Sequence, residues 1–304
     1  MARVLVTRRL PGPALQRLKA EHEVDVWPEP LPPPPNVLRA RAARAEGLLA
    51  LITDRIDADL IDNCPDLRVI SNYAVGSDNV DVAAAAARSI PVGITPDVLT
   101  NATADLAFAC LLAAARRLPE AMAAVREGAW KTWGPEWLLG YDVHGATLGI
   151  VGFGRIGRAV ARRAEGFDME VLHTGDVPLP ELLERADAVS LHVPLTPDTR
   201  HLIDDEALGR MKPTAVLVNT ARGGIVDQEA LARALHDGGI AGAALDVTDP
   251  EPLPPDHPLL EAPNLLVLPH IGSATHHARE RMADIAVDNL LAGLAGEPLP
   301  HPAA

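Results

Sequence analysis

The feature that most constrains this chain is a glycine-rich turn between a strand and a helix. The hexapeptide Gly152-Phe153-Gly154-Arg155-Ile156-Gly157 follows an apolar run at 148–151 and opens an amphipathic segment at 155–165. Glycines at this spacing let the backbone approach a pyrophosphate at the N-terminus of the helix, where N–H groups and the helix dipole favour an anion. We therefore expect a dinucleotide-binding α/β domain in which every residue of this motif except Phe153 contacts the cofactor.

Short apolar segments alternate with amphipathic ones on both sides of this turn. Such alternation is typical of strands and helices that form a doubly wound, mainly parallel sheet. The first turn, at 7–12, lacks the glycine spacing, so we do not expect the N-terminal part to bind the dinucleotide. The expected strands lie near 4–6, 24–26, 48–52, 68–71 and 92–94 before the glycine-rich turn, and near 148–151, 170–173, 188–192, 215–219, 242–246 and 265–268 around and after it.

The length of the chain, 304 residues, favours two domains. A long helical stretch at 101–127 is expected to lead from the first domain into the second. A final helix near 277–294 has no room in the second sheet and is expected to return to the first domain. We predict an α/β fold with two doubly wound parallel-sheet domains, a Rossmann-type cofactor domain inserted into a flavodoxin-like substrate domain. The substrate domain then covers 1–97 plus 273–304, and the dinucleotide-binding domain covers 98–272.

Composition narrows the choice of partners and location. The formal net charge of −14 repels phosphate backbones and anionic lipids, so neither nucleic acid nor a membrane is an expected partner. The longest apolar run, at 106–115, is about half the roughly 20 residues needed to span a bilayer. The N-terminus does not resemble a signal peptide, and the only cysteines are Cys64 and Cys110, which favours a reducing cytoplasm.

Residues with catalytic chemistry follow the later strands of the second domain. Arg222, Glu251 and His270 each lie at or just after the end of an expected strand, where an open α/β sheet places its ligands. A guanidinium binds a carboxylate as a bidentate fork and polarises a neighbouring carbonyl oxygen. Imidazole exchanges a proton near neutral pH, and a carboxylate such as Glu251 stabilises its charged form. The set therefore indicates carbonyl reduction by hydride, with His270 as the proton donor.

The same segments resemble the D-isomer-specific 2-hydroxyacid dehydrogenases, over most of the chain. The resemblance implies NAD(P)-dependent hydride transfer at the 2-position of a small 2-hydroxy or 2-oxo acid, with Arg222, Glu251 and His270 as the catalytic set. Further segments are similar to the glyoxylate/hydroxypyruvate reductase (glycerate dehydrogenase) branch. The family segments are GFGRIG at 152–157, HVPLTPDTRHLI at 192–203, NTARGGIVD at 219–227, ALDVTDPEPLP at 244–254 and LPHIGSAT at 268–275, and the branch segments are SNYAVGSDNVD at 71–81, TPDVLTNATADLAF at 95–108 and WKTWGPEWLLGY at 130–141.

The resemblance also implies individual contacts. Val75 and Gly76 are expected to present backbone N–H groups to the substrate carboxylate. Asp246 is expected to contact the nicotinamide carboxamide, and Thr103 is expected to lie near the nicotinamide. The remaining expected contacts are Ser273 with the substrate, and His192, Val193, Pro194, Thr199, Thr220, Ala221 and Gly272 with the cofactor.

The choice between NAD and NADP depends on the segment after the second strand of the cofactor domain. An acid about 20 residues after the glycines would bind the ribose of NAD. Thr174 stands at that position, Asp176 follows it, and no arginine that could bind a 2′-phosphate occurs before Arg185. We expect both residues to contact the cofactor and slightly favour NAD. The segment between His173 and Leu182 is shorter than in the family by roughly one helix, which removes an element beside the adenosine ribose.

The arm at 130–141 contains Trp130, Trp133 and Trp137, whereas the whole chain has only 4 tryptophans. Large aromatic residues are enriched in interface cores, so we expect a homodimer in which this arm, and Trp137 in particular, helps to form the substrate site of the partner. The alternative is that the tryptophans cover helices of their own domain.

Other functions compatible with this sequence are a dinucleotide-sensing corepressor or scaffold on the same fold, another D-2-hydroxyacid specificity, and formate or phosphite oxidation. The formate branch typically carries glutamine where Glu251 stands. No metal site is expected at His276-His277, because no cluster of carboxylates accompanies the pair.

Overall fold

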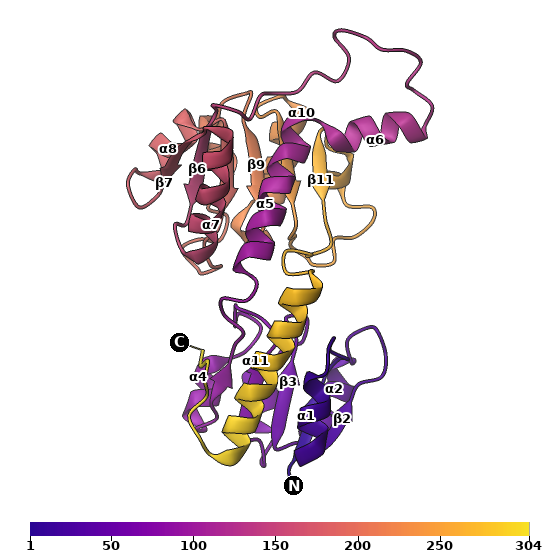
Figure 1. The fold of residues 1–304 in the computed structure, drawn as a ribbon, viewed down its shortest axis with the longest axis vertical. Helices are drawn as coiled ribbons and strands as arrows, with labels where there is room; N and C mark the ends of the chain where they lie inside the picture. The colour runs from indigo at the N-terminus through magenta and orange to yellow at the C-terminus, as the bar shows by residue number, and fades with distance from the viewer. Residues whose placement is uncertain (304) are drawn as a thin grey trace. The chain divides into compact units, whose positions relative to one another are not determined.

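The computed structural model describes residues 1–303, which form two compact units (Figure 1). Unit 1 comprises residues 1–99 together with those from 274 onward, and unit 2 comprises 100–273. The boundaries expected from the sequence lie close to these, after 97 and after 272. Both units are α/β, with parallel strands and alternating helices, and this confirms the expected fold class.

Unit 1 contains a five-stranded sheet in the order β2-β1-β3-β4-β5, and every pair of neighbouring strands is parallel. Strands β3 and β4 are buried at every residue, as expected for a parallel sheet with helices on both faces. The strands are β1 (Arg3–Val6), β2 (Glu23–Val26), β3 (Gly47–Ala50), β4 (Val69–Asn72) and β5 (Val92–Gly93), and the helices are α1 (Ala14–Glu21), α2 (Pro35–Ala42), α3 (Ala58–Asp62), α4 (Val82–Ala87) and α11 (His276–Ala295).

Two hydrophobic cores lie on opposite faces of the unit 1 sheet. One includes Leu38 of α2 with Leu60 and Ile61 of α3. The other includes Leu18 of α1 and Leu290 of α11. The last helix of the chain therefore completes a core whose strands come from the first hundred residues, so unit 1 is discontinuous in sequence.

Unit 2 contains a six-stranded parallel sheet in the order β11-β10-β9-β8-β6-β7. The strands are β6 (Thr147–Val151), β7 (Glu170–His173), β8 (Ala188–Leu191), β9 (Val216–Asn219), β10 (Gly242–Leu245) and β11 (Leu265–Val267). The helices are α5 (Thr100–Ala115), α6 (Leu118–Arg126), α7 (Arg155–Ala164), α8 (Leu179–Arg185), α9 (Asp205–Arg210) and α10 (Gln228–His236), with short 3₁₀ turns η1 (Glu165–Phe167), η2 (Gly223–Ile225) and η3 (Pro258–Glu261).

Strand β7 forms one edge of the unit 2 sheet. Dinucleotide-binding sheets usually have the order 3-2-1-4-5-6, in which a further strand lies outside the second. Here residues 174–178 connect β7 directly to α8, and the described residues place no strand beyond β7. The shortened segment noted in the sequence therefore coincides with the place where that outer strand would be.

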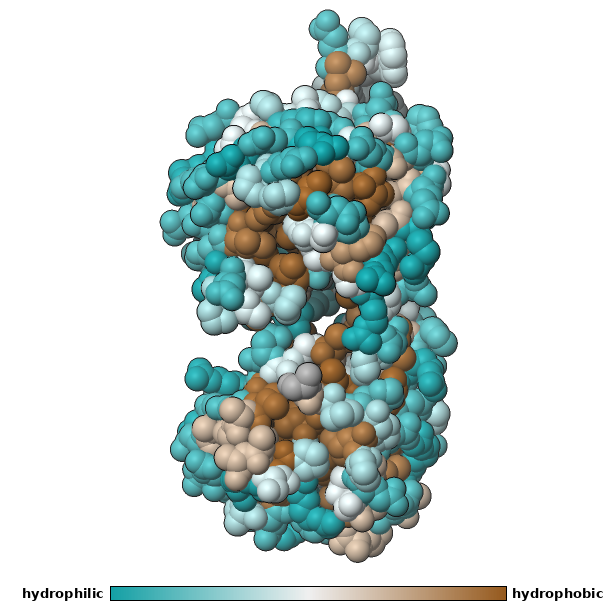
Figure 2. All heavy atoms as spheres, turned by 90° about the vertical axis from the view of Figure 1, so that its left-hand side faces the viewer, coloured by the Kyte–Doolittle hydropathy of each residue, from teal (hydrophilic) through white to brown (hydrophobic). Residues whose placement is uncertain are grey.

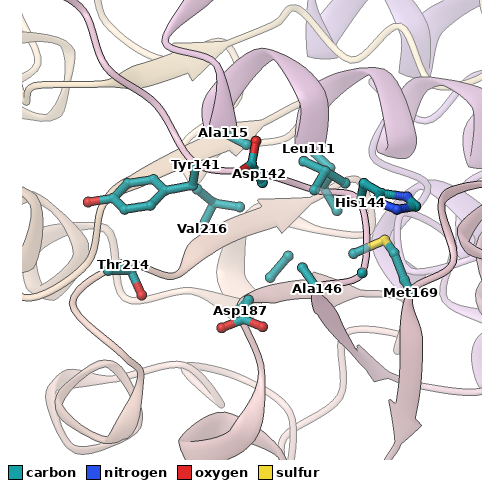
Figure 3. A pocket seen from close by; sticks show the side chains of 13 residues that line it. Leu111, Ala115, Tyr141, Asp142, His144, Ala146, Met169, Asp187, Thr214 and Val216 are labelled. Atoms are coloured by element: carbon teal, nitrogen blue, oxygen red, sulfur yellow. The ribbon is translucent and has the colours of Figure 1, made fainter. Parts of the chain in front are cut away.

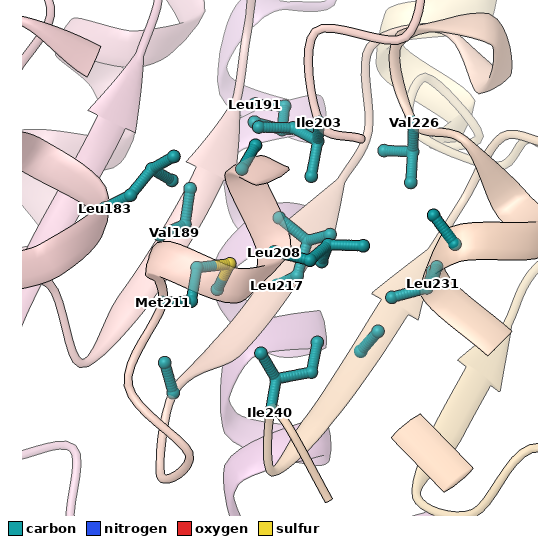
Figure 4. Close-up of a cluster of buried hydrophobic side chains, with 14 of the residues drawn as sticks. Leu183, Val189, Leu191, Ile203, Leu208, Met211, Leu217, Val226, Leu231 and Ile240 are labelled. Carbon is teal, nitrogen blue, oxygen red and sulfur yellow. The ribbon is translucent and has the colours of Figure 1, made fainter. Parts of the chain in front are cut away.

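The core of unit 2 also has two parts. Figure 4 shows one of them, in which Leu183 of α8, Leu208 of α9 and Leu231 of α10 meet side chains from β8 and β9. The other contains Leu111 of α5 and Val160 of α7. Helix α5 is rich in alanine, and small side chains allow a helix to lie close to the sheet that it covers.

Several helices begin where the sequence provides a side-chain cap. The side chains of Asp57, Asp81, Asp204, Asp227 and Thr275 accept hydrogen bonds from the first-turn N–H groups of α3, α4, α9, α10 and α11. Each cap satisfies donors that have no partner within the helix.

The single helix expected over 101–127 is wrong, because the chain forms α5 and α6 with a break between them. Pro119 would clash with the carbonyl group four residues earlier in a continuous helix. That carbonyl, of Ala115, instead accepts a hydrogen bond from the N–H of Tyr141 at 2.9 Å. Arg117 adopts a left-handed conformation with φ of +52°, which redirects the chain into α6.

The segment after α6 leaves unit 2 as an extended loop and returns before β6 (Figure 1). Its aromatic residues are exposed.

Figure 2 shows the side of unit 2 that carries β7 and α8. A hydrophobic patch surrounded by hydrophilic residues lies on that side. None of the helices in residues 1–303 is long and apolar enough to cross a membrane.

Candidate active site

The candidate catalytic residues follow neighbouring strands of the unit 2 sheet. Arg222 comes after β9, Glu251 lies in the loop after β10, and His270 comes after β11. Because β9, β10 and β11 are adjacent and parallel, the loops that follow them leave from the same edge of the sheet. The sheet topology therefore gathers three residues that are far apart in the sequence.

His270 and Glu251 form a direct pair. The His270 Nδ1 atom is hydrogen-bonded to the Oε1 atom of Glu251. The side chains are 24% and 36% exposed, so the pair is partly shielded from water but remains accessible. The bond engages one ring nitrogen of His270 and leaves Nε2 for a proton transfer.

The backbone of His270 is held in an unusual conformation. Its φ of +55° lies in the left-handed region, which costs free energy for a residue with a Cβ and persists only when its surroundings enforce it. The surroundings are provided by Asp246, whose carbonyl oxygen accepts the His270 N–H at 2.9 Å.

Asp246 fixes the rest of this loop through its side chain. Its Oδ1 atom accepts the N–H of Ile271 and its Oδ2 atom accepts the N–H of Gly272, each at 2.7 Å. Burial raises the pKa of the Asp246 carboxyl, although the two N–H groups act in the opposite direction. Thr103 of α5 donates to the carbonyl oxygen of Gly272 at 3.2 Å. The residues expected near the nicotinamide thus also position the histidine loop.

The loop that carries Arg222 is shaped by a buried asparagine that the sequence motifs did not single out. Asn219, the last residue of β9, donates to the Arg222 carbonyl oxygen at 2.8 Å and accepts the Ala221 N–H at 3.0 Å. A Cβ on Gly223 would lie 2.0 Å from the carbonyl carbon of Thr248. The loops after β9 and β10 are therefore in backbone contact, which only glycine allows.

Gln228 is a second residue that was not expected from the sequence. Its amide donates to the Asp249 carbonyl oxygen at 2.5 Å and accepts the Asp249 N–H at 3.0 Å. These two hydrogen bonds hold the loop that carries Glu251 against the start of α10. The sequence offered no clear signal for either Asn219 or Gln228, because the contacts that define their roles form only in the folded chain.

The glycine-rich turn has the shape needed for a pyrophosphate. Gly152 has φ of +97°, and a Cβ there would lie 2.7 Å from the carbonyl carbon of His192. A Cβ on Gly157 would lie 2.2 Å from the Gly152 oxygen, so α7 can pack this closely only with glycine. Gly154, which caps α7, has open space instead, because no atom lies within 4 Å of the position that a Cβ would take. The tight positions shape the turn, whereas the open position leaves room for an anion at the N-terminus of α7.

Loops from β8 and β9 complete this region. The Ser190 Oγ and His192 Nε2 atoms lie 2.8 Å apart. Burial lowers the pKa of His192 to about 4, so its ring is neutral at neutral pH. Thr199 donates to the Pro194 carbonyl oxygen at 2.6 Å and thereby closes the loop after β8. The Thr220 hydroxyl is buried without a hydrogen-bond partner in the described part of the chain, as expected for a group that a cofactor would satisfy.

At the end of β7, Thr174 and Asp176 have separate roles. The Thr174 hydroxyl accepts the Gly152 N–H at 3.1 Å, which ties β7 to the glycine-rich turn. Asp176 Oδ2 lies 2.9 Å from His173 Nε2. The His173 ring stacks on Phe153, with centroids 3.7 Å apart and planes 10° apart. The Gly175 N–H donates to His173 Nδ1 at 3.1 Å.

The expected contacts to the substrate carboxylate lie in unit 1. Val75 and Gly76 follow β4 and are half-buried. Among residues 1–303, no acceptor is found for either N–H group. Ser273 ends unit 2, and Trp137 lies on the arm with 43% of its surface exposed.

Figure 3 shows a cavity of about 230 Å³ at the opposite edge of the unit 2 sheet. It is lined by Ala146, Asp187 and Val216, which lie at the amino-terminal ends of β6, β8 and β9, together with Tyr141 and His144. None of the predicted catalytic or cofactor residues lines it. The candidate site is therefore the carboxyl edge, and this cavity is separate from it.

The sequence also matches known proteins. The family described as "D-isomer specific 2-hydroxyacid dehydrogenase, NAD binding domain" matches residues 108–272. A glyoxylate reductase from Korarchaeum cryptofilum is 51% identical, over 98% of this chain and 95% of its own. A glyoxylate reductase from Pyrococcus furiosus is 46% identical, over 97% of this chain and 93% of its own.

Solved structures agree with the sequence comparison. The TT0316 protein from Thermus thermophilus matches with a TM-score of 0.94 and 53% identity, covering 99% of this chain and 100% of its own. An NADPH-dependent glyoxylate/hydroxypyruvate reductase from Sinorhizobium meliloti, in complex with NADP and malonate, matches with a TM-score of 0.88 and 35% identity, covering 100% and 97% of the two chains. Because the family match covers more than half of the chain and relatives up to 51% identical match nearly all of it, the chain belongs to the D-isomer-specific 2-hydroxyacid dehydrogenases.

Proposed function

We propose that this protein reduces glyoxylate and hydroxypyruvate to glycolate and D-glycerate with NAD(P)H, and catalyses the reverse oxidations. The observation that carries the proposal is the His270–Glu251 pair, on the same sheet edge as Arg222 and the dinucleotide turn. The relatives named as glyoxylate reductases, which match nearly the whole chain, support the choice of substrate.

The residues divide the chemistry between them. When bound, the nicotinamide supplies a hydride to C2 of the 2-oxo acid and becomes oxidised. Arg222 binds the carboxylate and polarises the carbonyl group with its guanidinium. His270 donates a proton from Nε2 to the carbonyl oxygen, which completes the hydroxyl group, and Glu251 stabilises the charged imidazole through Nδ1. In the oxidation, His270 accepts the same proton.

Unit 1 offers further donors for the substrate carboxylate. We assign this role to the N–H groups of Val75 and Gly76, which lack acceptors in the described chain. Successive backbone N–H groups can form an anion-binding concavity. A backbone N–H group without a partner in the protein is available to donate to such an anion.

For the cofactor, we propose that both NADH and NADPH bind and that NADH is preferred. Asp176 uses Oδ2 for His173, which leaves Oδ1 to accept a ribose hydroxyl. No arginine lies between Thr174 and Arg185, although Arg155 and Arg158 lie on α7. The NADPH-dependent relative from Sinorhizobium meliloti is the reason to keep NADPH as a substrate.

We propose a homodimer in which the arm at 130–141 reaches the substrate site of the partner. Trp133 is 80% exposed, so it does not cover helices of its own unit. Leu118, Met122 and Val125 of α6 are also exposed and extend the apolar surface toward the arm. Exposed apolar groups of this extent mark interaction sites.

The reducing cytoplasm remains the proposed location, supported by the free thiols Cys64 and Cys110.

Steady-state kinetics test this proposal. Glyoxylate, hydroxypyruvate and pyruvate are assayed with NADH and with NADPH, and formate is assayed with NAD and with NADP. We expect the highest kcat/KM with glyoxylate or hydroxypyruvate. Cofactor binding without turnover of any of these acids would instead favour a dinucleotide-sensing protein. Formate oxidation as the main activity would place the chain in another branch.

A further inference from the structure

Two asparagines brace the turn that follows β4. Asn72, the last residue of the strand, is fully buried, and its Nδ2 atom donates to the Gly76 carbonyl oxygen and to Asn79 Oδ1, each at 2.9 Å. Asn79 Nδ2 donates to the carbonyl oxygens of Leu51 at 2.9 Å and Asp54 at 3.0 Å. The turn at 75–76 is thereby connected to β4 at one end and to the loop after β3 at the other.

The loop after β3 is itself fixed. Asp54 accepts the Leu51 N–H at 2.8 Å through Oδ2, which also accepts the Thr7 hydroxyl. Its Oδ1 atom lies 3.6 Å from the guanidinium of Arg8, which is also buried. Asn79 therefore anchors the turn to a rigid, buried network at the carboxyl ends of β1 and β3.

We infer that Asn72 and Asn79 are positioning residues that set the affinity for the substrate carboxylate by fixing the backbone of Val75 and Gly76. This inference rests on the proposed function. The amide hydrogens of both asparagines are used within unit 1, so neither side chain has a donor left for the substrate. Their effect must pass through the backbone, where the Val75 and Gly76 N–H groups have no acceptor among residues 1–303.

The physical reason is preorganisation. Two N–H groups bind an anion well only when both point to the same place before it arrives. The bond from Asn72 fixes the peptide plane that follows Gly76, and the Asn72–Asn79 pair stops the turn from opening. Without them the N–H groups must be ordered when the substrate binds, and this cost weakens substrate binding without affecting the cofactor site in unit 2.

The test compares Asn72→Ala and Asn79→Ser with Asn289→Ala. Asn289 is an equally buried asparagine of unit 1 that also uses both ends of its amide, donating to the Ile94 carbonyl oxygen at 3.0 Å and accepting the His301 N–H at 3.1 Å, but it does not contact the turn. For each variant, the melting temperature, the Kd of NADH, kcat, and the KM of glyoxylate are measured. Oxalate, a two-carbon carboxylate that cannot accept a hydride, gives an inhibition constant as a second readout.

We expect Asn72→Ala and Asn79→Ser to raise the KM of glyoxylate and the inhibition constant of oxalate about fivefold or more, the scale of one lost buried hydrogen bond. The Kd of NADH should stay within about twofold, and Asn289→Ala should lower the melting temperature without raising KM. The inference would be overturned if the KM of glyoxylate in Asn72→Ala and Asn79→Ser were the same as in the control Asn289→Ala. If Asn72→Ala does not fold, the comparison of Asn79→Ser with the control decides. A wild type that turns over no 2-oxo acid would overturn the proposed function instead.

Discussion

His270 depends on two different carboxylates. Glu251 holds Nδ1 of the ring, and Asp246 holds the backbone on both sides of the strained residue. The ring is thus oriented before the substrate binds, which is the state that general acid catalysis requires. We therefore expect changes in any of these three residues to impair catalysis.

We expect His270→Gln to lower kcat for glyoxylate reduction by about 10²- to 10⁴-fold, the usual contribution of a general acid. The Kd of NADH, measured by fluorescence titration, should change little, because the imidazole acts on the substrate oxygen. Turnover above about a tenth of the wild-type value would mean that another group supplies the proton.

Asp176 provides a test of cofactor choice. If its free oxygen accepts a ribose hydroxyl, the wild type should have a higher kcat/KM with NADH than with NADPH, and Asp176→Ala should narrow this preference. His173→Phe, which keeps the stack on Phe153 but removes the partner of Asp176, is the matched variant for the role of the pair. A clear wild-type preference for NADPH would contradict this assignment.

His192 should make the fold sensitive to acid. Its pKa of about 4 in the folded protein lies below the ordinary 6.5, so between these values the unfolded chain binds a proton that the folded chain does not. The contribution of His192 to the free energy of unfolding is therefore fully present above about pH 6.5 and is lost as the pH falls toward 4. Between pH 7 and pH 5 the free energy of unfolding of the wild type should fall by about 2 kcal/mol more than that of His192→Gln. Equal pH dependence of unfolding in the two proteins would show that His192 does not contribute.

Single residues also show what the sequence can and cannot predict. The positions of Arg222, Glu251 and His270 after β9, β10 and β11 were predictable because each residue follows an apolar run that reads as a strand, whereas their catalytic roles stay a prediction. Asn219 and Gln228 were not predictable, because their roles depend on contacts made only in the folded chain, such as the one between Gln228 and Asp249. Nor did the sequence indicate that Asp176 pairs with His173.

At the scale of elements, the glycine-rich turn contains glycines that close packing requires, such as Gly157, and one that packing does not require, Gly154. Gly157→Ala should destabilise unit 2, because its Cβ would overlap the Gly152 carbonyl oxygen. Gly154→Ala has open space and should leave the melting temperature nearly unchanged while weakening NADH binding. Thermal unfolding with and without NADH distinguishes the two. Equal losses of stability without cofactor would contradict the assignment of Gly154 to the ligand side.

The elements were predicted unevenly for physical reasons. Buried parallel strands such as β3 and β9 are continuous apolar runs and were found close to their observed bounds. The helix over 101–127 was drawn too long, although Pro119 signalled the break between α5 and α6. The edge position of β7 could not be read from the pattern alone, since strand order depends on tertiary pairing.

At the scale of the whole molecule, variants of the exposed arm at 130–141 test the proposed homodimer. Deleting residues 130–139 should convert the proposed dimer into monomers in sedimentation experiments. Trp137→Ala should retain the dimer and raise kcat/KM for larger 2-oxo acids relative to glyoxylate, whereas Trp133→Ala is the matched arm substitution at a more exposed position. A wild type that sediments as a monomer at micromolar concentration and turns over substrate normally would contradict the dimer.

The product formed from hydroxypyruvate reports on the proposed reaction and on the role of His270 together. The wild-type protein is incubated with hydroxypyruvate and NADH, and the oxidised cofactor and each enantiomer of glycerate are quantified by chiral chromatography. We expect D-glycerate in equal amount to the oxidised cofactor, and about a hundredth of that product or less with His270→Gln over the same period. Formation of L-glycerate, or no reduction by a protein that binds NADH, would contradict the proposed reaction.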